Sequence, residues 1–305
     1  MNKIVIMSAV QLMKCAQTQT RDICKEAVEE CGLALQFVKE QTPELCLAAV
    51  KQNGLALQFV KEQTEEICLT AIEQDTYALQ FVKEQTCRIC LEAVKKNPFS
   101  IKFVKEQTPE ICGTAIDINS FALEHVKIQT PDLCLLAVMN HGYAIYSVKD
   151  KTRKLCIEAV KRHPYVIHAI EQCDDDFYLE VIQINPRIME YIKSPTQEFL
   201  LQAMSKNGLA LQFVKEQTPE LCLAAVKQNG LALQFVKEQT PELCLAAVKQ
   251  NGLALQFVKE QTPELCLAAV KQNGMALQFV KEQTLDMFAI AFLQNGMAFQ
   301  FSKFH

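Results

Sequence analysis

The chain has 305 residues, half of them apolar and 22% charged, with a formal net charge of −4 and a pI near 5.8. This composition excludes a disordered chain. It also excludes a protein drawn to nucleic acid or anionic lipid by its overall charge. No stretch reaches the roughly 18 to 20 consecutive apolar residues of a membrane span.

The first residues, MNKIVIMSAVQLMKCA, allow two alternatives to a folded start. One is a short signal peptide, because a lysine precedes the apolar run from Ile4 to Val10. The other is a lipoprotein signal at Cys15, which Lys14 disfavours because a small residue is required there. The segment instead continues the repeat described next, so we expect a cytoplasmic protein without membrane partners.

A 22-residue period organises the chain. Thirteen positions from Thr20 to Thr284 follow this spacing without an insertion, and only Asp174 replaces the threonine. Such a period indicates an array whose units bury their apolar faces against neighbours. We expect one domain over residues 1–305. It divides into a degenerate repeat at 1–19, regular repeats at 20–112, diverged central repeats at 113–205, near-identical repeats at 206–284 and a hydrophobic C-terminal cap at 285–305.

One unit, TPELCLAAVKQNGLALQFVKEQ at residues 42–63, predicts two short helices. Thr42 is a good N-cap, Pro43 suits the first helical position, and the apolar residues that follow have helical spacing. Gly54, after Asn53, is expected to be the C′ residue that ends this helix. A second helix is expected over residues 55–62. The result is an all-α solenoid of helical hairpins with 22 residues per two-helix repeat.

Two other folds fit less well. The spacing loosely matches leucine-rich repeats, but strand-forming residues are scarce and Thr-Pro-Glu caps a helix. Asn-Gly also suits a β-hairpin turn, but its flanks lack period-two alternation.

Ten of the fourteen cysteines share one repeat position, at which the other units carry Tyr178, Leu200 and Phe288. Replacement by large apolar groups indicates core positions, where free cysteine behaves as a small hydrophobe. We therefore expect structural thiols in a reducing compartment. Cys87 and Cys90 form a C-x-x-C pair without a second pair, so we expect no metal and no cofactor.

Units of the form AVKQNGLALQFVKEQT resemble a family of short helical repeats of unknown function found in bacterial and large-virus proteins. The resemblance covers most of the chain and implies an all-α repeat protein. It transfers no catalytic or binding residue, and the central units depart from it most.

The central units carry five of the six tyrosines and four of the five histidines. The position of Leu55 is aromatic in five successive units, either as half-buried packing or as a recognition strip; these residues are Tyr77, Phe99, Phe121, Tyr143 and Tyr165. A neighbouring outward position carries Gln80, Lys102, Glu124, Tyr146, His168 and Glu190. We expect Tyr146 and His168 to be neighbours on one face.

Two further features have a structural and a functional interpretation. His141 and His163 stand where an imidazole can meet the free carbonyls at a helix end. The functional alternative is a shared metal ion, which needs both nitrogens within about 2.1 Å of one ion, whereas adjacent repeats are separated by about one helix-packing distance. Asp174 replaces the capping threonine, and Asp175 and Asp176 suit the first helical turn or the docking of a basic partner.

The last unit is unusually apolar. Leu293 replaces lysine, Phe304 replaces glutamate and Ile290 fills an outward position. We expect either a cap that folds its aromatic rings inward or an end-to-end contact that gives a homodimer.

The sequence holds no phosphate loop, nucleophile motif or unexplained carboxylate pair, so we expect no enzyme. Nucleic acid is disfavoured because the recurring lysine at Lys61 is neutralised by the adjacent Glu62. We expect a protein-binding scaffold, with a structural or self-assembling rod as the alternative. The candidate partner contacts are Glu124, His125, Tyr143, Tyr146, Tyr165, His168, Asp175, Asp176 and Glu190.

Overall fold

The computed structural model describes residues 19–171 and 173–304. The signal-peptide and lipoprotein alternatives, and nearly all of the expected repeat at 1–19, lie outside the described residues. The chain divides into two compact units, residues 1–162 and 163–305. The prediction of a single domain over the whole chain stays a prediction.

Every described repeat consists of a ten-residue α-helix followed by a six-residue 3-10 helix, which confirms the predicted all-α repeat fold. The first unit contains α2 Arg21–Glu30, η1 Gly32–Phe37, α3 Pro43–Gln52, η2 Gly54–Phe59, α4 Glu65–Gln74, η3 Thr76–Phe81, α5 Cys87–Lys96, η4 Pro98–Phe103, α6 Pro109–Ile118, η5 Ser120–His125, α7 Pro131–Asn140, η6 Gly142–Ser147 and α8 Arg153–Arg162. The second contains η7 Pro164–Ala169, α9 Asp175–Ile184, η8 Pro186–Tyr191, α10 Gln197–Lys206, η9 Gly208–Phe213, α11 Pro219–Gln228, η10 Gly230–Phe235, α12 Pro241–Gln250, η11 Gly252–Phe257, α13 Pro263–Gln272, η12 Gly274–Phe279, α14 Leu285–Gln294 and η13 Gly296–Phe301.

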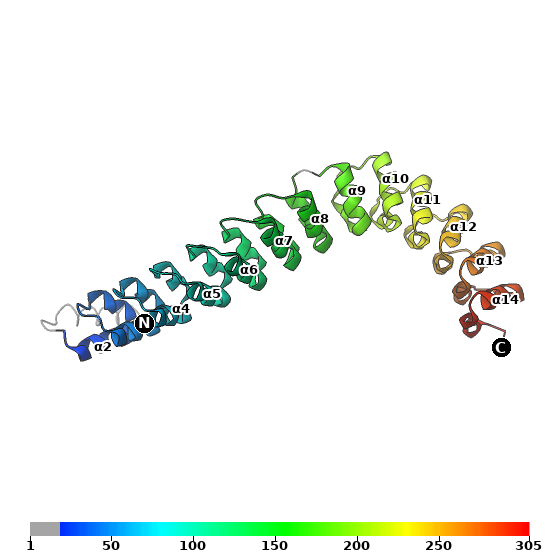
Figure 1. Cartoon of the computed structure of the whole chain (residues 1–305). Coiled ribbons are helices and arrows are strands. Elements are labelled where there is room, and N and C mark those ends of the chain that lie inside the picture. Colours follow the sequence, from blue (N-terminus) through cyan, green and yellow to red (C-terminus); the bar gives the residue numbers. More distant parts are fainter. Residues whose placement is uncertain (1–18, 172, 305) are drawn as a thin grey trace. The chain divides into compact units, whose positions relative to one another are not determined.

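Within each unit the α-helices lie side by side in chain order, and the 3-10 helices follow the same order beside them (Figure 1). Most α-helices also contact the 3-10 helix of the preceding repeat, as α3 does with η1 and α11 does with η9. Helices this short are marginal alone, so contacts between repeats provide most of the stability. None of the described helices has the length and apolar character needed to cross a membrane.

The α-helices begin as predicted. Thr42 Oγ1 accepts a hydrogen bond from the backbone N–H of Leu45 at 3.4 Å, and Pro43 occupies the first helical turn. Cys46, Ala49 and Ala56 are buried. The small side chains at the last two positions let neighbouring helices approach closely.

The helix ends as predicted, with Gly54 at the C′ position, but this glycine does not adopt the left-handed conformation usual there. Asn53, in an extended conformation, caps the C-terminus of α3, and no described glycine has a positive φ. The glycine is required by close approach instead. A Cβ on Gly54 would lie 2.4 Å from the carbonyl oxygen of Ala71 in the next repeat.

The second helix is shorter than predicted. It is a 3-10 helix from Gly54 to Phe59, started by an Asn53 side chain that accepts from the N–H of Leu55 at 3.0 Å. Val60 follows the last helical residue, has an extended backbone conformation and is buried. The expected tail of this helix, Lys61 and Glu62, therefore lies in the loop that connects to the next repeat.

Glutamines of this loop tie consecutive repeats together. Gln41 Nε2 donates to the carbonyl of Phe59 at 2.9 Å, and Gln41 Oε1 accepts from the N–H of Lys61 at 3.0 Å. We call the residues that repeat these two bonds the loop glutamines: Gln19, Gln41, Gln63, Gln85, Gln107, Gln129, Gln217, Gln239, Gln261 and Gln283. Each loop glutamine satisfies backbone groups that the 3-10 helix leaves open.

A second set of glutamines satisfies the start of the 3-10 helices. Gly54 N–H donates to Gln74 Oε1 at 2.6 Å, from the α-helix of the next repeat. Some diverged repeats lack this glutamine and place a proline, which has no N–H to satisfy, at the glycine position. The pairs are Pro98 with Ile118, Pro164 with Ile184, and Pro186 with Lys206.

The recurring lysine has a partner other than the predicted glutamate. Lys61 Nζ donates to the carbonyl of Lys39 at 2.8 Å, and Lys83 Nζ donates in turn to the carbonyl of Lys61. These ammonium groups therefore hold the preceding repeat's loop. Their positive charge serves packing between repeats.

The shared cysteine position is part of the core, as predicted, and every described cysteine is free. Cys46 Sγ lies 3.8 Å from Gln41 Oε1. Burial raises the pKa of the Cys68 and Cys90 thiols to about 11.

These thiols should resist modification, because only the thiolate reacts. At pH 8 a thiol of pKa 11 is ionised in roughly one molecule in a thousand. Cys87 is exposed, so we expect it to react quickly with a thiol reagent such as Ellman's reagent, whereas Cys68 and Cys90 wait for unfolding. Cys87→Ser should lose one fast-reacting thiol per chain, and an unchanged fast phase would contradict this.

Candidate functional site

The aromatic residues at the Leu55 position lie second in five consecutive 3-10 helices. Tyr77, Phe121 and Tyr165 are 46%, 39% and 54% exposed, whereas Phe99 and Tyr143 are half-buried. Each ring thus packs partly against neighbouring repeats and is partly open to water. This partial exposure is compatible with half-buried packing and with a recognition strip.

In the first unit each of two rings packs on the last residue of the next 3-10 helix. The ring centroids lie 5.4 Å apart for Tyr77 and Phe103, and 5.9 Å apart for Phe99 and His125. Lys102 Nζ lies 4.9 Å from the centroid of Tyr77 and 4.8 Å from that of Phe103. The edge-to-face and cation–π geometries are favourable, so these side chains form an ordered surface.

The series continues at the C-terminal end of the first unit. His141 lies between two rings, with its centroid 5.4 Å from Phe121 and 5.6 Å from Tyr143. Tyr143 stacks on Tyr146 at 6.3 Å with an interplanar angle of 11°. Tyr146 is 52% exposed and faces outward as predicted. Unlike asparagine at this position, His141 makes no side-chain capping bond to η6.

The second unit holds a triad of rings. The centroids of Tyr165 and His168 lie 5.0 Å apart, those of His168 and Tyr191 5.3 Å, and those of Tyr165 and Tyr191 6.0 Å. Tyr191 is one of the five central tyrosines but is not among the predicted partner contacts. Its repeat position is phenylalanine in the regular units and changes to His125, Ser147, Ala169 and Tyr191 at the centre, and this change was the available signal.

Tyr146 and His168 belong to different units. Both side chains are exposed. Their predicted proximity stays a prediction.

The acidic candidates occupy different environments. Glu124 is exposed on η5, whereas Glu190 Oε2 accepts from Arg187 Nε at 2.9 Å on η8. Asp174 Oδ1 accepts from the N–H of Phe177 at 2.7 Å, so the predicted helix start is confirmed. Asp175 and Asp176 lie exposed in the first turn of α9, where carboxylates complement the positive helix end.

The cysteine pair does not converge on a shared site. Cys90 is buried in the core, whereas Cys87 is exposed, with Sγ 3.9 Å from Glu110 Oε2. Over the residues that the structure describes, no three His, Cys, Asp or Glu side chains gather into a group able to hold a metal ion.

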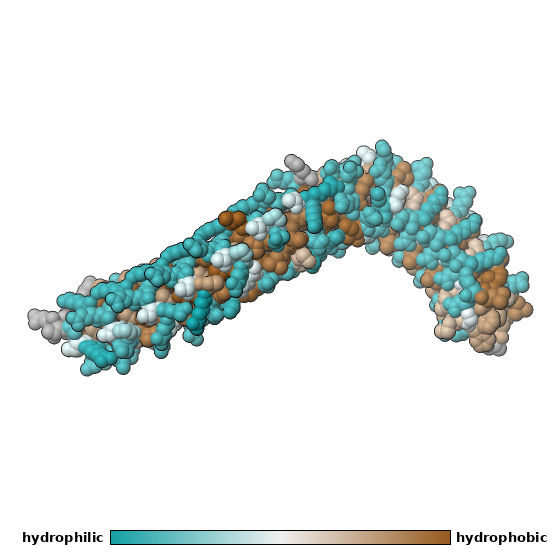
Figure 2. All heavy atoms as spheres, viewed as in Figure 1, coloured by the Kyte–Doolittle hydropathy of each residue, from teal (hydrophilic) through white to brown (hydrophobic). Residues whose placement is uncertain are grey.

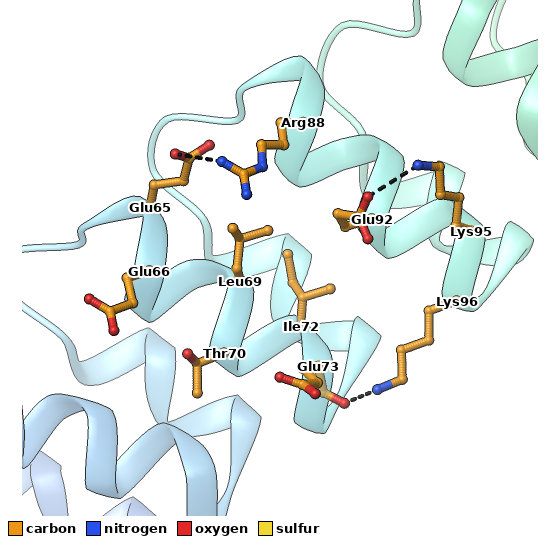
Figure 3. A pocket seen from close by; sticks show the side chains of 10 residues that line it. All are labelled: Glu65, Glu66, Leu69, Thr70, Ile72, Glu73, Arg88, Glu92, Lys95 and Lys96. Carbon is orange, nitrogen blue, oxygen red and sulfur yellow. Dashed lines mark hydrogen bonds and ion pairs between the residues drawn. The ribbon is translucent and has the colours of Figure 1, made fainter.

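An open groove of about 900 Å³ lies between α4 and α5, in the α-helical layer (Figure 3). Glu65 pairs with Arg88 at 3.6 Å, and Glu92 pairs with Lys95 at 3.2 Å. Lys96 donates to the carbonyl of Glu73. Most of the charged side chains that line this groove thus have hydrogen-bond or ion-pair partners on the same two helices.

The last repeat exposes large apolar side chains, and Figure 2 shows apolar surface gathered at the end of the second unit that carries α14. Leu293 is 84% exposed and Phe304 46%, whereas Ile290 is half-buried. Phe288 lies at the centre of a ring cluster, 6.1 Å from Phe292 and 6.4 Å from Phe304. The rings thus pack on one another and still present an apolar face.

Comparison with known proteins identifies the repeat. A family model described as a domain of unknown function (DUF4116) matches residues 20–64, 42–87, 64–108, 196–240, 218–262 and 240–285. These stretches cover more than half of the chain and leave out the central repeats. No curated protein and no solved structure matches the chain.

Proposed function

Because the chain belongs to the DUF4116 family, whose function is unknown, we propose a function from its own residues: a non-catalytic scaffold that binds a protein partner through its diverged central repeats. It would use no cofactor and act in the cytoplasm, a compartment that suits its many free thiols.

The observation that carries the proposal is the exposed aromatic side chains that ring neighbours hold in place, on η5 and η6 in the first unit and on η7 and η8 in the second. Tyrosine provides a large rigid contact area with a polar tip and is enriched at binding hot spots. Tyr146 and Tyr165 are more than half exposed, although ring neighbours hold both side chains. The family model also omits these repeats. Nucleic acid is a weaker candidate, because the recurring lysines hold neighbouring loops.

The test is affinity capture from cell lysate with the Tyr146→Ala/His168→Ala double variant beside the intact chain. Both side chains are exposed, so we expect the double variant to fold normally, and its circular dichroism spectrum should match that of the intact chain. We expect at least one captured protein to be lost. The matched control, Gln234→Ala/Gln256→Ala, changes the same repeat position in two near-identical repeats and should capture it normally. Equal recovery with the double variant would refute this site.

Self-association is a second candidate function, supported by the apolar last repeat. Leu285, Leu293 and Phe304 stand at positions held by Pro263, Lys271 and Glu282 in the preceding repeat, all of which are exposed. Stacking of a further regular repeat would therefore not cover these three side chains. A second copy of this chain is the proposed occupant of this face.

A further inference from the structure

The loop glutamines are interrupted at three successive positions, which hold Lys151, Cys173 and Pro195. Pro195 belongs to the second unit, in the loop between η8 and α10. Its predecessor Ser194 has φ 50, the one positive φ among the described non-glycine residues. Such backbone conformations are uncommon and suggest a functional role when surrounding structure enforces them.

The next repeat shows what a loop glutamine does at this place. Gln217 Nε2 donates to the carbonyl of Phe235 at 2.9 Å, and Gln217 Oε1 accepts from the N–H of Lys237 at 3.1 Å. Cys222 Sγ also approaches Gln217 Oε1, at 3.7 Å. One primary carboxamide thus lies between a backbone acceptor and a backbone donor. We call the space between these two groups the slot.

Pro195 has no carboxamide to fill the equivalent slot. The corresponding backbone groups are the carbonyl of Phe213 and the N–H of Lys215, 18 and 20 residues further along the chain. In the described part of the chain, neither group has a hydrogen-bond partner. Leu200 stands where the cysteine would be. The donor and the acceptor remain, but the amide that joins them elsewhere is missing.

Space is available at this slot. An open cavity of about 800 Å³ is lined by Phe213 and Lys215, together with Pro195 and the apolar side chains of Met189, Ile192 and Leu200. This volume is within the range of ligand sites and far exceeds that of one amide. The carboxylates of Glu190 and Glu216 also line the cavity, so an acidic ligand is disfavoured.

We propose that this cavity binds the carboxamide of a glutamine side chain from the partner polypeptide, which takes the place of the missing loop glutamine. The amide N–H would donate to the Phe213 carbonyl, and the amide oxygen would accept from the Lys215 N–H. A carboxylate has no proton to donate, and an apolar side chain leaves both groups unpaired. The inference rests on the proposed function, because it assigns chemistry to the same partner.

A random 12-residue peptide library displayed on phage and selected on the intact chain tests this site. We expect selected peptides to share a glutamine, and its replacement by glutamate in the synthetic peptide should weaken binding about tenfold or more. Pro195→Gln should fill the slot from within and abolish binding. Pro195→Ala removes the ring without supplying an amide and should bind.

Three results would overturn the inference: selection that yields no glutamine-containing peptide, undiminished peptide binding to Pro195→Gln, or a lowered unfolding temperature of that variant. That variant should also raise the unfolding temperature by a few degrees, because it restores the two bonds; a lowered temperature would show that no carboxamide fits. Some peptides could bind Pro195→Gln as tightly as the intact chain but fail to bind Tyr146→Ala/His168→Ala. That result would contradict the slot at Pro195 and still support the proposed aromatic site.

Discussion

Replacing Gly252 with alanine should lower the free energy of unfolding by about 2 kcal/mol, the range expected for overpacking. The new Cβ would lie 2.4 Å from the carbonyl oxygen of Ala269 and 3.0 Å from Gln272 Oε1. The first of these atoms is backbone at the end of a packed helix, so α13 has to move away. That movement also strains the hydrogen bond from Gly252 N–H to Gln272 Oε1, now 2.6 Å.

Gly113→Ala is the matched control, because it makes the same chemical change with the opposite expected sign. Gly113 lies inside α6, and its Cβ would meet no atom within 4 Å. Alanine is there favoured over glycine by about 1 kcal/mol through helix propensity. Urea unfolding followed by circular dichroism measures both variants. Stabilisation by both substitutions would refute the close-packing role of the repeated glycine.

The apolar face of the last repeat should hold two copies of the chain together. Six of its side chains are 46% to 84% exposed: Leu285, Phe292, Leu293, Met297, Phe299 and Phe304. Taking about 200 Å² for a large apolar side chain, they expose roughly 700 Å², close to the ~800 Å² per partner of a standard interface. We expect the intact chain to sediment as a dimer at micromolar concentration.

Restoring the residues of the preceding repeat, Leu293→Lys with Phe304→Glu, should give a monomer. Both positions are exposed in that repeat, where they hold Lys271 and Glu282, so folding should be unaffected. Lys271→Ala serves as the control and should leave association unchanged. A monomeric intact chain, or a double variant that still dimerises, would contradict self-association through this face.

The sequence predicted the α-helices well because their signals are local. Thr42 and Pro43 mark the start of α3, and the apolar spacing marks its buried face. Gly54 was predicted correctly as the residue after the helix end, but the reason for a glycine was not predicted. Glycine serves two purposes, positive φ and close approach, and the Ala71 carbonyl that decides between them lies in the next repeat. Lys61 was likewise assigned to its neighbour in sequence, whereas its partner is 22 residues away.

The candidate site was predicted in part. Periodicity placed Tyr146, Glu124 and His168 on an exposed position, and the structure confirms that exposure. It did not indicate which rings pack together, because Tyr165 and Tyr191 are 26 residues apart and occupy different repeat positions. The slot at Pro195 was also missed. Recognising it requires the two hydrogen bonds of Gln217, which only the folded repeats define.

Hydrogen–deuterium exchange of the chain, alone and with a captured partner, tests binding through the central repeats most directly. Peptides from residues 113–205 differ from those of every other repeat, so their exchange is assigned without ambiguity. We predict slower exchange in η6, η7 and η8 on binding, with residues 218–283 unchanged. Protection confined to the near-identical repeats would contradict a partner site at the centre.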